Sequence, residues 1–143
     1  MLRLNHIRKR FGSLVAVGDL SLNIERGEFF GLLGPNGAGK TTTIRMAIGQ
    51  LPPDGGTVDV AGAGPPVDPR VRRRIGIAPQ ALAIYDELSG EENLLFFGRL
   101  YGLHGKTLRR RVAEVLDLVG LTDRRKDRIK KYSGGMQRRL NLA

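Results

Sequence analysis

The residues with the clearest chemistry in this sequence of 143 residues form a glycine-rich stretch, GPNGAGKTT, which fits the pattern G-x-x-x-x-G-K-[ST]. Glycines let successive backbone N–H groups turn inward as an anion-binding nest, because a positive φ costs them little. A lysine adds a mobile positive charge for phosphate oxygens, and a threonine hydroxyl is small enough to ligate a hydrated Mg²⁺. The stretch therefore predicts a site for a nucleoside triphosphate with Mg²⁺. Its residues are Gly34, Pro35, Asn36, Gly37, Ala38, Gly39, Lys40, Thr41 and Thr42.

The segments on either side of this loop fit a strand, a loop and a helix in that order. Residues 29–33, FFGLL, are a short apolar run, as expected of a strand that is buried on both faces. Residues 42–48 predict a helix, which Gly49 and the two following prolines would end. Such a helix would direct the positive end of its dipole at the bound phosphates. This context favours a phosphate-binding loop over an incidental glycine-rich turn.

A second apolar run, residues 75–78, predicts another buried strand, with Gln80 just after its end. Ligands of open α/β sheets bind at the carboxyl ends of the strands, so we expect Gln80 beside the phosphate-binding loop. Its amide would ligate Mg²⁺ or position a water there; the alternative is a polar loop residue. Before the loop, alternating residues between 2 and 24 predict two or three antiparallel strands. Phe11, at a turn among them, would stack on a purine base or tuck into the small sheet.

From Ala81 onward the pattern becomes helical. Ser89 and Glu92 form a capping box ahead of a helix that runs to about residue 101. Thr107 is expected to cap the next helix, which Gly120 would end. One face of that helix is apolar. The residues of this face are Leu108, Val112, Val115, Leu116 and Val119.

A last helix is expected to begin after Ser133, which reads as its N-cap, and its first turn holds Gly134, Gly135 and Met136. Two glycines there would cost the helix about 1 kcal/mol each relative to alanine. Their use would be bare N–H groups at the positive helix end, which suits a second phosphate-binding surface. An ordinary capped helix start fits the same residues.

Composition and charge narrow the class of protein. Hydrophobic residues make up 41% and charged residues 27%, as in globular domains, and no apolar run is long enough to span a bilayer. The absence of cysteine excludes disulfides and thiolate metal sites. The net charge of +10 lies almost entirely after residue 69 and would attract nucleic acid or anionic lipid. Aromatic residues are not interleaved with the basic ones, which favours solvated helix faces.

Three segments together resemble the ATP-binding subunit of ABC transporters. GPNGAGKTT is similar to that family's Walker A loop, APQ at 78–80 to its Q-loop, and YSGGMQRRLNLA at 132–143 to its signature motif. Tyr132 and Met136 depart from the usual LSGGQ. The YSGGM form and ELSGEENLLFFGRLYGL at 87–103 resemble the exporters of drugs and polyketides. Phe11 falls at the family's base-stacking aromatic residue, which is more usually tyrosine.

This resemblance implies an α/β fold of the P-loop NTPase class, with an N-terminal antiparallel β subdomain and an α-helical insertion. We expect residues 1–28 to form the β subdomain, 29–80 the P-loop core and 81–143 the helical subdomain with the signature helix. The cofactors implied are ATP and Mg²⁺. Lys40 and Gln80 would be catalytic, and Thr41 and Gln80 would bind the metal.

The resemblance also implies partners. ATP on one subunit's loop would be covered by Ser133, Gly134, Gly135 and Met136 of a second copy. ATP binding and hydrolysis would drive export through a transmembrane permease on a separate chain, at the cytoplasmic face of the membrane. Two alternatives come from other classes: a non-transport ABC ATPase that acts on ribosomes or nucleic acid, and a regulatory module that only binds nucleotide. A second phosphate-loop cassette or a long coiled-coil insertion would favour the first alternative, and neither appears in residues 1–143, so nucleic acid is not an expected partner.

The family's pattern continues after the signature with a strand that ends in Asp-Glu, the Walker B motif, and with a switch histidine. Residues 1–143 contain neither. We therefore expect a C-terminally truncated ATPase domain that binds ATP weakly at most and does not hydrolyse it. The missing strand would flank the strand at 29–33, so an exposed apolar edge is expected there.

Overall fold

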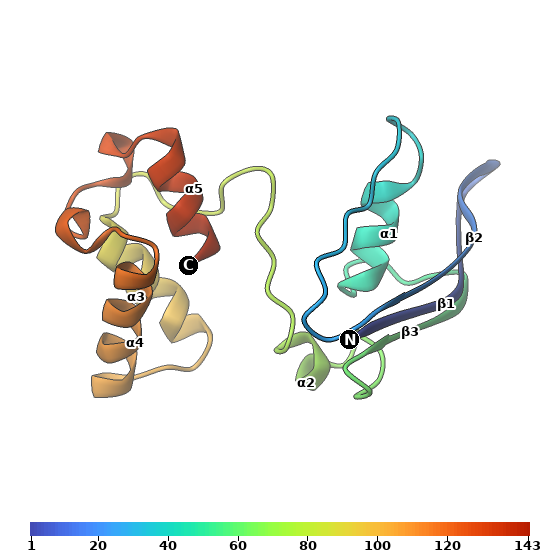
Figure 1. The fold of residues 1–143 in the computed structure, drawn as a ribbon, viewed down its shortest axis with the longest axis horizontal. Coiled ribbons are helices and arrows are strands. Elements are labelled where there is room, and N and C mark those ends of the chain that lie inside the picture. The colour runs from blue at the N-terminus through green and yellow to red at the C-terminus, as the bar shows by residue number, and fades with distance from the viewer. The chain divides into compact units, whose positions relative to one another are not determined.

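The computed structural model describes all residues from 1 to 143, which form two compact units, Met1–Gly76 and Ile77–Ala143. The first unit contains the strands β1 to β3 and the helices α1 and α2, and the second contains α3 to α5 (Figure 1). None of the helices is long and apolar enough to cross a bilayer. The finer division at residues 28 and 80 stays a prediction.

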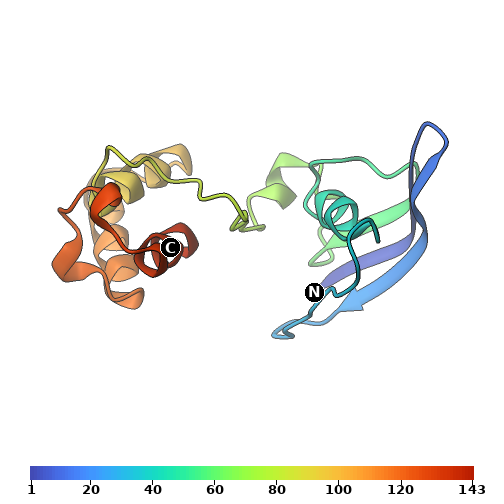
Figure 2. The same cartoon turned by 90° about the horizontal axis from the view of Figure 1, so that it is seen from above.

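An antiparallel sheet in the order β2-β1-β3 forms the first unit. β1 (Leu2–Phe11) and β2 (Leu14–Ile24) make a hairpin, and β3 (Gly55–Val60) pairs with the other edge of β1. The antiparallel strands predicted before the loop are confirmed. α1 (Lys40–Ala47) lies on one face of the sheet (Figure 2), and α2 (Pro69–Arg72) is a single turn. The core between α1 and the sheet contains Leu4, Ile7, Val17, Met46 and Val58.

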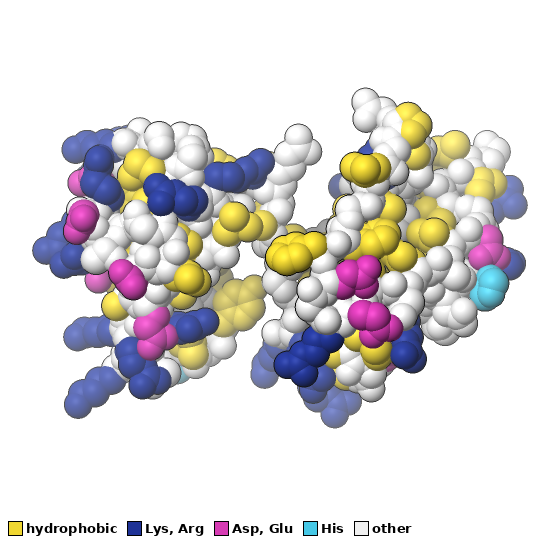
Figure 3. All heavy atoms as spheres, in the orientation of Figure 1, with side chains coloured by type: hydrophobic (Ala, Val, Ile, Leu, Met, Phe, Trp, Pro, Cys, Tyr) yellow, Lys and Arg dark blue, Asp and Glu magenta, His cyan; other side chains and the backbone are white.

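The two buried strands expected at 29–33 and 75–78 are wrong, because neither segment is a strand. Phe29 and Leu33 are fully or almost fully exposed, and Ile77 is half exposed. A parallel strand is stable only when neighbouring strands satisfy its backbone and layers cover both of its faces. Neither segment has a partner strand within residues 1–143, so both remain irregular. Figure 3 shows hydrophobic side chains exposed on the visible face of the first unit.

The second unit packs three helices around one apolar core. These are α3 (Gly90–Leu100), α4 (Gly105–Leu118) and α5 (Gly134–Leu142), with 3₁₀ turns at Thr122–Arg124 and Ile129–Lys131. The predicted apolar face of α4 is confirmed, since its central residues are buried. The core contains Leu108, Val112, Leu116, Leu121, Ile129, Tyr132 and Leu140.

The expected cap of α4 by Thr107 is wrong. The N–H of Leu108 donates to the carbonyl of His104 at 3.2 Å, and this bond makes His104 the N-cap. Gly102, with φ of 83°, ends the preceding helix and turns the chain early enough for α4 to begin at Gly105. Thr107 therefore lies inside the first turn.

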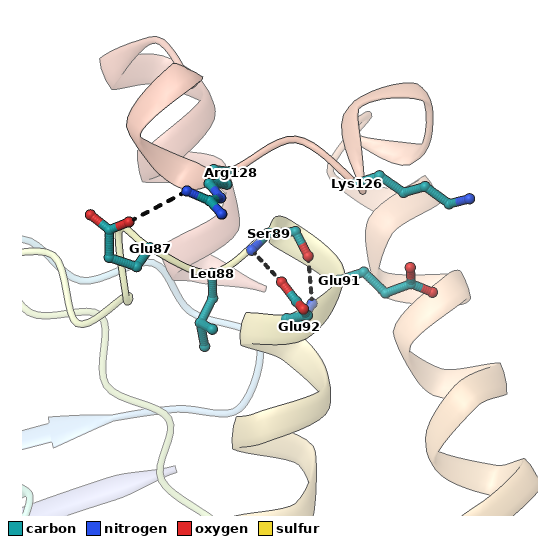
Figure 4. A pocket seen from close by; sticks show the side chains of 7 residues that line it. All are labelled: Glu87, Leu88, Ser89, Glu91, Glu92, Lys126 and Arg128. Carbon is teal, nitrogen blue, oxygen red and sulfur yellow. Dashed lines mark hydrogen bonds and ion pairs between the residues drawn. The ribbon is translucent and has the colours of Figure 1, made fainter.

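The capping box of α3 is confirmed. The Ser89 hydroxyl accepts the Glu92 N–H at 3.2 Å, and the Ser89 N–H donates to Glu92 Oε2 at 2.8 Å. These residues line a pocket of about 360 Å³, where Glu87 also pairs with Arg128 (Figure 4). The hydrogen bond from the Ser89 N–H stabilises the charged form of the Glu92 carboxylate, so the pKa of Glu92 lies below its usual value.

The capping box predicts a specific dependence of stability on pH. Because the pKa of Glu92 is lowered in the folded state, its stabilisation is complete above its ordinary value of 4.5 and is lost as the pH falls through the lower folded-state value. Glu92→Gln keeps an acceptor but cannot titrate. Urea unfolding from about pH 5 to about pH 3 should show a steeper loss of stability in the wild type than in this variant. Parallel curves for the two proteins would contradict this.

Candidate nucleotide-binding site

The glycine-rich loop has left-handed backbone at two of its glycines, as an anion-binding nest requires. Gly37 and Gly39 have φ of 86° and 81°, in the left-handed region that favours glycine. Gly39 is the N-cap of α1, and its carbonyl accepts the Thr43 N–H at 2.8 Å. The N–H groups of the helical residues before Thr43 have no carbonyl partner within the helix. The helix predicted after the loop is confirmed, and its N-terminal, positive end lies at the loop.

Gly39 also fixes the loop against the sheet. A Cβ added at this position would collide with the carbonyl oxygen of Ala16 and would lie 3.2 Å from Val17 Cγ2. Both of these residues belong to β2, so the loop approaches the strand more closely than any side chain permits. The absence of a side chain at this position therefore sets where the loop sits on the sheet.

Lys40 directs its positive charge at its own loop. Its Nζ donates to the carbonyls of Gly34 and Pro35, both at 2.6 Å. Phosphate oxygens carry full negative charge and accept stronger hydrogen bonds than carbonyls do, so they would compete for the same ammonium group. Thr41, the next residue, is exposed, and its hydroxyl is accessible to a cation bound with the phosphates.

Phe11 lies at the end of β1 and its ring is about half exposed. It pairs across the hairpin with Leu14, which is two residues from Ala16, the residue that Gly39 touches. Two residues of strand span about 7 Å. The unit thus brings the candidate aromatic residue near the candidate phosphate loop.

The other candidate residues belong to the second unit. Ser133 caps α5, since its hydroxyl accepts the Met136 N–H at 3.3 Å. Gly134 and Gly135 are exposed, and a Cβ on Gly134 would meet nothing within 4 Å. Packing inside the chain therefore does not require these glycines, and their N–H groups are open to an external ligand.

Tyr132, which replaces the usual leucine of the signature, has a structural explanation. Its hydroxyl donates to the Arg124 carbonyl at 2.8 Å, and its ring is buried in the core of the second unit. Burial raises the pKa of Tyr132, so the phenol stays neutral at physiological pH. The hydroxyl fills space beside Gly90, where a Cβ would collide with it.

The segment from Pro79 to Ala83, which contains Gln80, is held by two residues of α5 that were not among the predicted site residues. Arg138 Nη1 donates to the carbonyls of Pro79 and Gln80 at 3.2 and 2.9 Å. Asn141, one turn later, accepts the Ala83 N–H at 2.8 Å. The segment with Gln80 is thereby tied to the helix with the two glycines. Their i, i+3 spacing on the last helix was the only sequence signal for this contact.

A metal ion would depend on the nucleotide for most of its ligands. The chain contains no group of three or more His, Cys, Asp or Glu side chains that could hold an ion. Mg²⁺ often binds through one or two protein oxygens and several phosphate oxygens, and the Thr41 hydroxyl fits that arrangement. The residues present thus suit Mg²⁺ that arrives with a phosphate ligand.

Comparisons with known proteins agree with one another. A family model described as ABC transporter matches residues 17–143. The linearmycin resistance ATP-binding protein LnrL of Bacillus subtilis is 46% identical over 144 residues, which cover 99% of this chain and 46% of that protein. The doxorubicin resistance ATP-binding protein DrrA of Mycobacterium tuberculosis is 45% identical over 142 residues, which cover 97% and 43%.

A third relative is the Nod factor export ATP-binding protein I of Sinorhizobium fredii, which is 45% identical over 143 residues, covering 99% of this chain and 42% of that protein. Among solved structures, one described as the ATP-binding subunit of an ABC transporter aligns with a TM-score of 0.81 at 29% identity. It covers 98% of this chain and 59% of that chain. The chain spans slightly less than half the length of these three curated relatives.

Proposed function

Since the chain belongs to the ABC transporter family, we propose that it is the ATP-binding part of an exporter. In the whole protein, ATP binding and hydrolysis would drive a small molecule out of the cell. The observation that carries this proposal is the left-handed glycine loop before α1, with the Lys40 ammonium group bound to two carbonyls of that loop. The names of relatives that confer resistance to linearmycin or doxorubicin, or export Nod factor, support the direction of transport.

In the proposed site, the loop from 34 to 42 binds the phosphates of ATP through its backbone N–H groups and Lys40. Thr41 holds Mg²⁺, which neutralises charge on the phosphate oxygens. Phe11 stacks on the adenine. The separation of a few strand residues between Phe11 and the loop supports one ligand spanning both. Gln80 is the proposed metal ligand or the residue that positions water, and Lys40 and Gln80 are the proposed catalytic residues of this chain.

The helix with the two glycines is proposed to complete the site of a second copy. Ser133, Gly134, Gly135 and Met136 would cover ATP bound to that copy's loop, giving a dimer with ATP between the subunits. The exposed N–H groups at the start of α5, where the helix dipole is positive, support this role. The ties from Arg138 and Asn141 would then transmit closure of this helix to Gln80.

A membrane permease on a separate chain is the proposed partner, with this protein bound peripherally at the cytoplasmic face. Tyr85 contacts two aromatic residues of α3: its ring centroid is 5.1 Å from that of Phe96 and 6.0 Å from that of Phe97. Tyr85 is half exposed and Phe96 is more than a third exposed. Exposed aromatic side chains gathered in one place are typical of protein interfaces. This cluster follows Gln80 closely in sequence, so permease contact would reach the ATP site through a short segment.

The proposal is tested with the intact protein reconstituted in vesicles with its permease. We expect ATP hydrolysis that rises when the permease is present, and ATP-dependent movement of a drug-like substrate to the side opposite the nucleotide. An ATPase activity that responds to ribosomes or nucleic acid in a salt-sensitive way, and not to the permease, would contradict export and favour the non-transport alternative.

A further inference from the structure

Asp54, in the turn before β3, binds two consecutive residues of β1. Its Oδ1 accepts a hydrogen bond from Lys9 Nζ at 2.6 Å, and its Oδ2 accepts the backbone N–H of Arg10 at 2.8 Å. Lys9 Nζ also donates to the Pro52 carbonyl at 2.9 Å, and the Asp54 N–H donates to the Arg8 carbonyl at 2.8 Å. We name the pair the Lys9–Asp54 clamp. It ties β1 to a turn more than forty residues away, just before Phe11.

The clamp is too well buried on one side to be an ordinary surface ion pair. The Lys9 side chain is 11% exposed and that of Asp54 is 46% exposed. A buried ammonium group that lost its carboxylate would remain desolvated without compensation, so the pair resists separation. Lys9 and the Arg10 N–H also hold the pKa of Asp54 below its usual value, which keeps the carboxylate charged near neutral pH.

Phe11 is fixed by this clamp in two ways. Its backbone follows directly on Arg10, whose N–H is bound by Asp54. Its ring lies with the centroid 5.8 Å from Lys9 Nζ, within the range of a cation–π contact. Nothing in the sequence pattern connects Asp54 with Phe11, because the contact is made only when the turn before β3 meets β1.

We infer that Lys9 and Asp54 are positioning residues for the base of the bound nucleotide. They hold Phe11 at a set place on the hairpin, from which it stacks on a purine while the glycine loop binds the phosphates. Substitutions at Lys9 or Asp54 should therefore lower the affinity only for ligands that carry a base. This inference rests on the proposed function, because it takes ATP as the ligand.

The test compares ATP with inorganic tripolyphosphate, which has the phosphates and no base. Their affinities for the intact protein, each with Mg²⁺, are measured by calorimetry. Stacking of a base on an aromatic ring contributes enough to binding that Phe11→Ala should lower the affinity for ATP about fivefold or more. Asp54→Asn keeps the Phe11 ring but displaces it, so this variant should lower the affinity for ATP about three- to tenfold. Neither variant should change the affinity for tripolyphosphate by more than about twofold.

Asp19→Asn is the matched control. Asp19 is exposed to almost the same extent, 43%, and it also binds two residues of β1, through the side chains of His6 and Arg8, both at 2.9 Å. It does not contact Phe11, so its loss should leave both affinities unchanged. Lys9→Met, which keeps the length of the side chain and removes its charge, should repeat the selective loss of ATP affinity. Urea unfolding of each variant establishes that the protein is folded.

The possible results separate this inference from the proposed function. An equal loss of ATP and tripolyphosphate affinity in Asp54→Asn, or the same ATP loss in Asp19→Asn, would overturn the inference, because the clamp would then only stabilise the sheet. Wild-type binding of both ligands with no effect of Phe11→Ala would also overturn it and would leave the phosphate site intact. A wild type that binds neither ligand would overturn the proposed function itself.

Discussion

Replacing Lys40 with alanine should lower the affinity of the intact protein for ATP about a hundredfold. Lys40 Nζ makes two hydrogen bonds of 2.6 Å to carbonyls of its own loop, so the ammonium group already stands where charged oxygens can replace those carbonyls. Hydrogen bonds between charged partners contribute about 1.5–3 kcal/mol each, and about 2.7 kcal/mol corresponds to a factor of about a hundred in affinity. The folded state should lose little stability, because Lys40 is the first residue of α1 and alanine is the best helix former.

The measurement is the same pair of titrations with ATP and tripolyphosphate. Because Lys40 binds phosphates, Lys40→Ala should lower the affinity for both ligands. The variants at Phe11 and Asp54 should lower the affinity for ATP alone. Lys106→Ala removes an exposed lysine of the second unit and serves as the control for loss of charge. Affinities of Lys40→Ala within about threefold of the wild type would show that the loop does not bind phosphate in the proposed way.

Features that depend on neighbours within one helical turn were predictable from the sequence. The capping box of α3 and the cap of α5 are bonds across three residues, of a kind that serine and glutamate favour at helix starts. The glycine loop is local too, because Gly37 and Gly39 adopt φ values that other residues avoid. The apolar face of α4 repeats at helical spacing and is buried as that spacing requires.

Features that need a partner distant in sequence were not predictable in this way. The apolar run at 29–33 has the composition of a buried strand, but a strand also needs a neighbour, and no strand of residues 1–143 pairs with it. Asp54 and Lys9 are ordinary charged residues in the sequence, and only the pairing of β3 with β1 joins them. Arg138 reaches Pro79 and Gln80 across almost sixty residues. Each of these contacts is determined by tertiary packing, which residue spacing does not encode.

Replacing Gly135 with alanine should make α5 more stable and yet reduce ATP hydrolysis by the proposed exporter complex about tenfold or more. A Cβ at this position would meet only Ser133 Oγ at 4.0 Å, and the backbone is not in the left-handed region, so alanine fits without strain. Relative to glycine, alanine stabilises a helix by up to about 1 kcal/mol. If Gly135 only begins a helix, the substitution should raise the stability of the protein without lowering ATP hydrolysis.

The added methyl group matters only if another molecule must approach this backbone closely. In the proposed dimer, the N–H groups at the start of α5 face the phosphates of ATP on the second copy, and a methyl group would hold the two surfaces apart. The affinity of a separate subunit for ATP should then be unchanged, because its own loop is intact, while turnover of the complex falls. Urea unfolding, ATP titration and steady-state hydrolysis measure the three effects separately. Gly76→Ala, at another glycine with open space around its Cβ, should change none of them appreciably. Full turnover in a stabilised Gly135→Ala protein would mean that the glycine is an ordinary helix start and that the nucleotide is not covered by this helix.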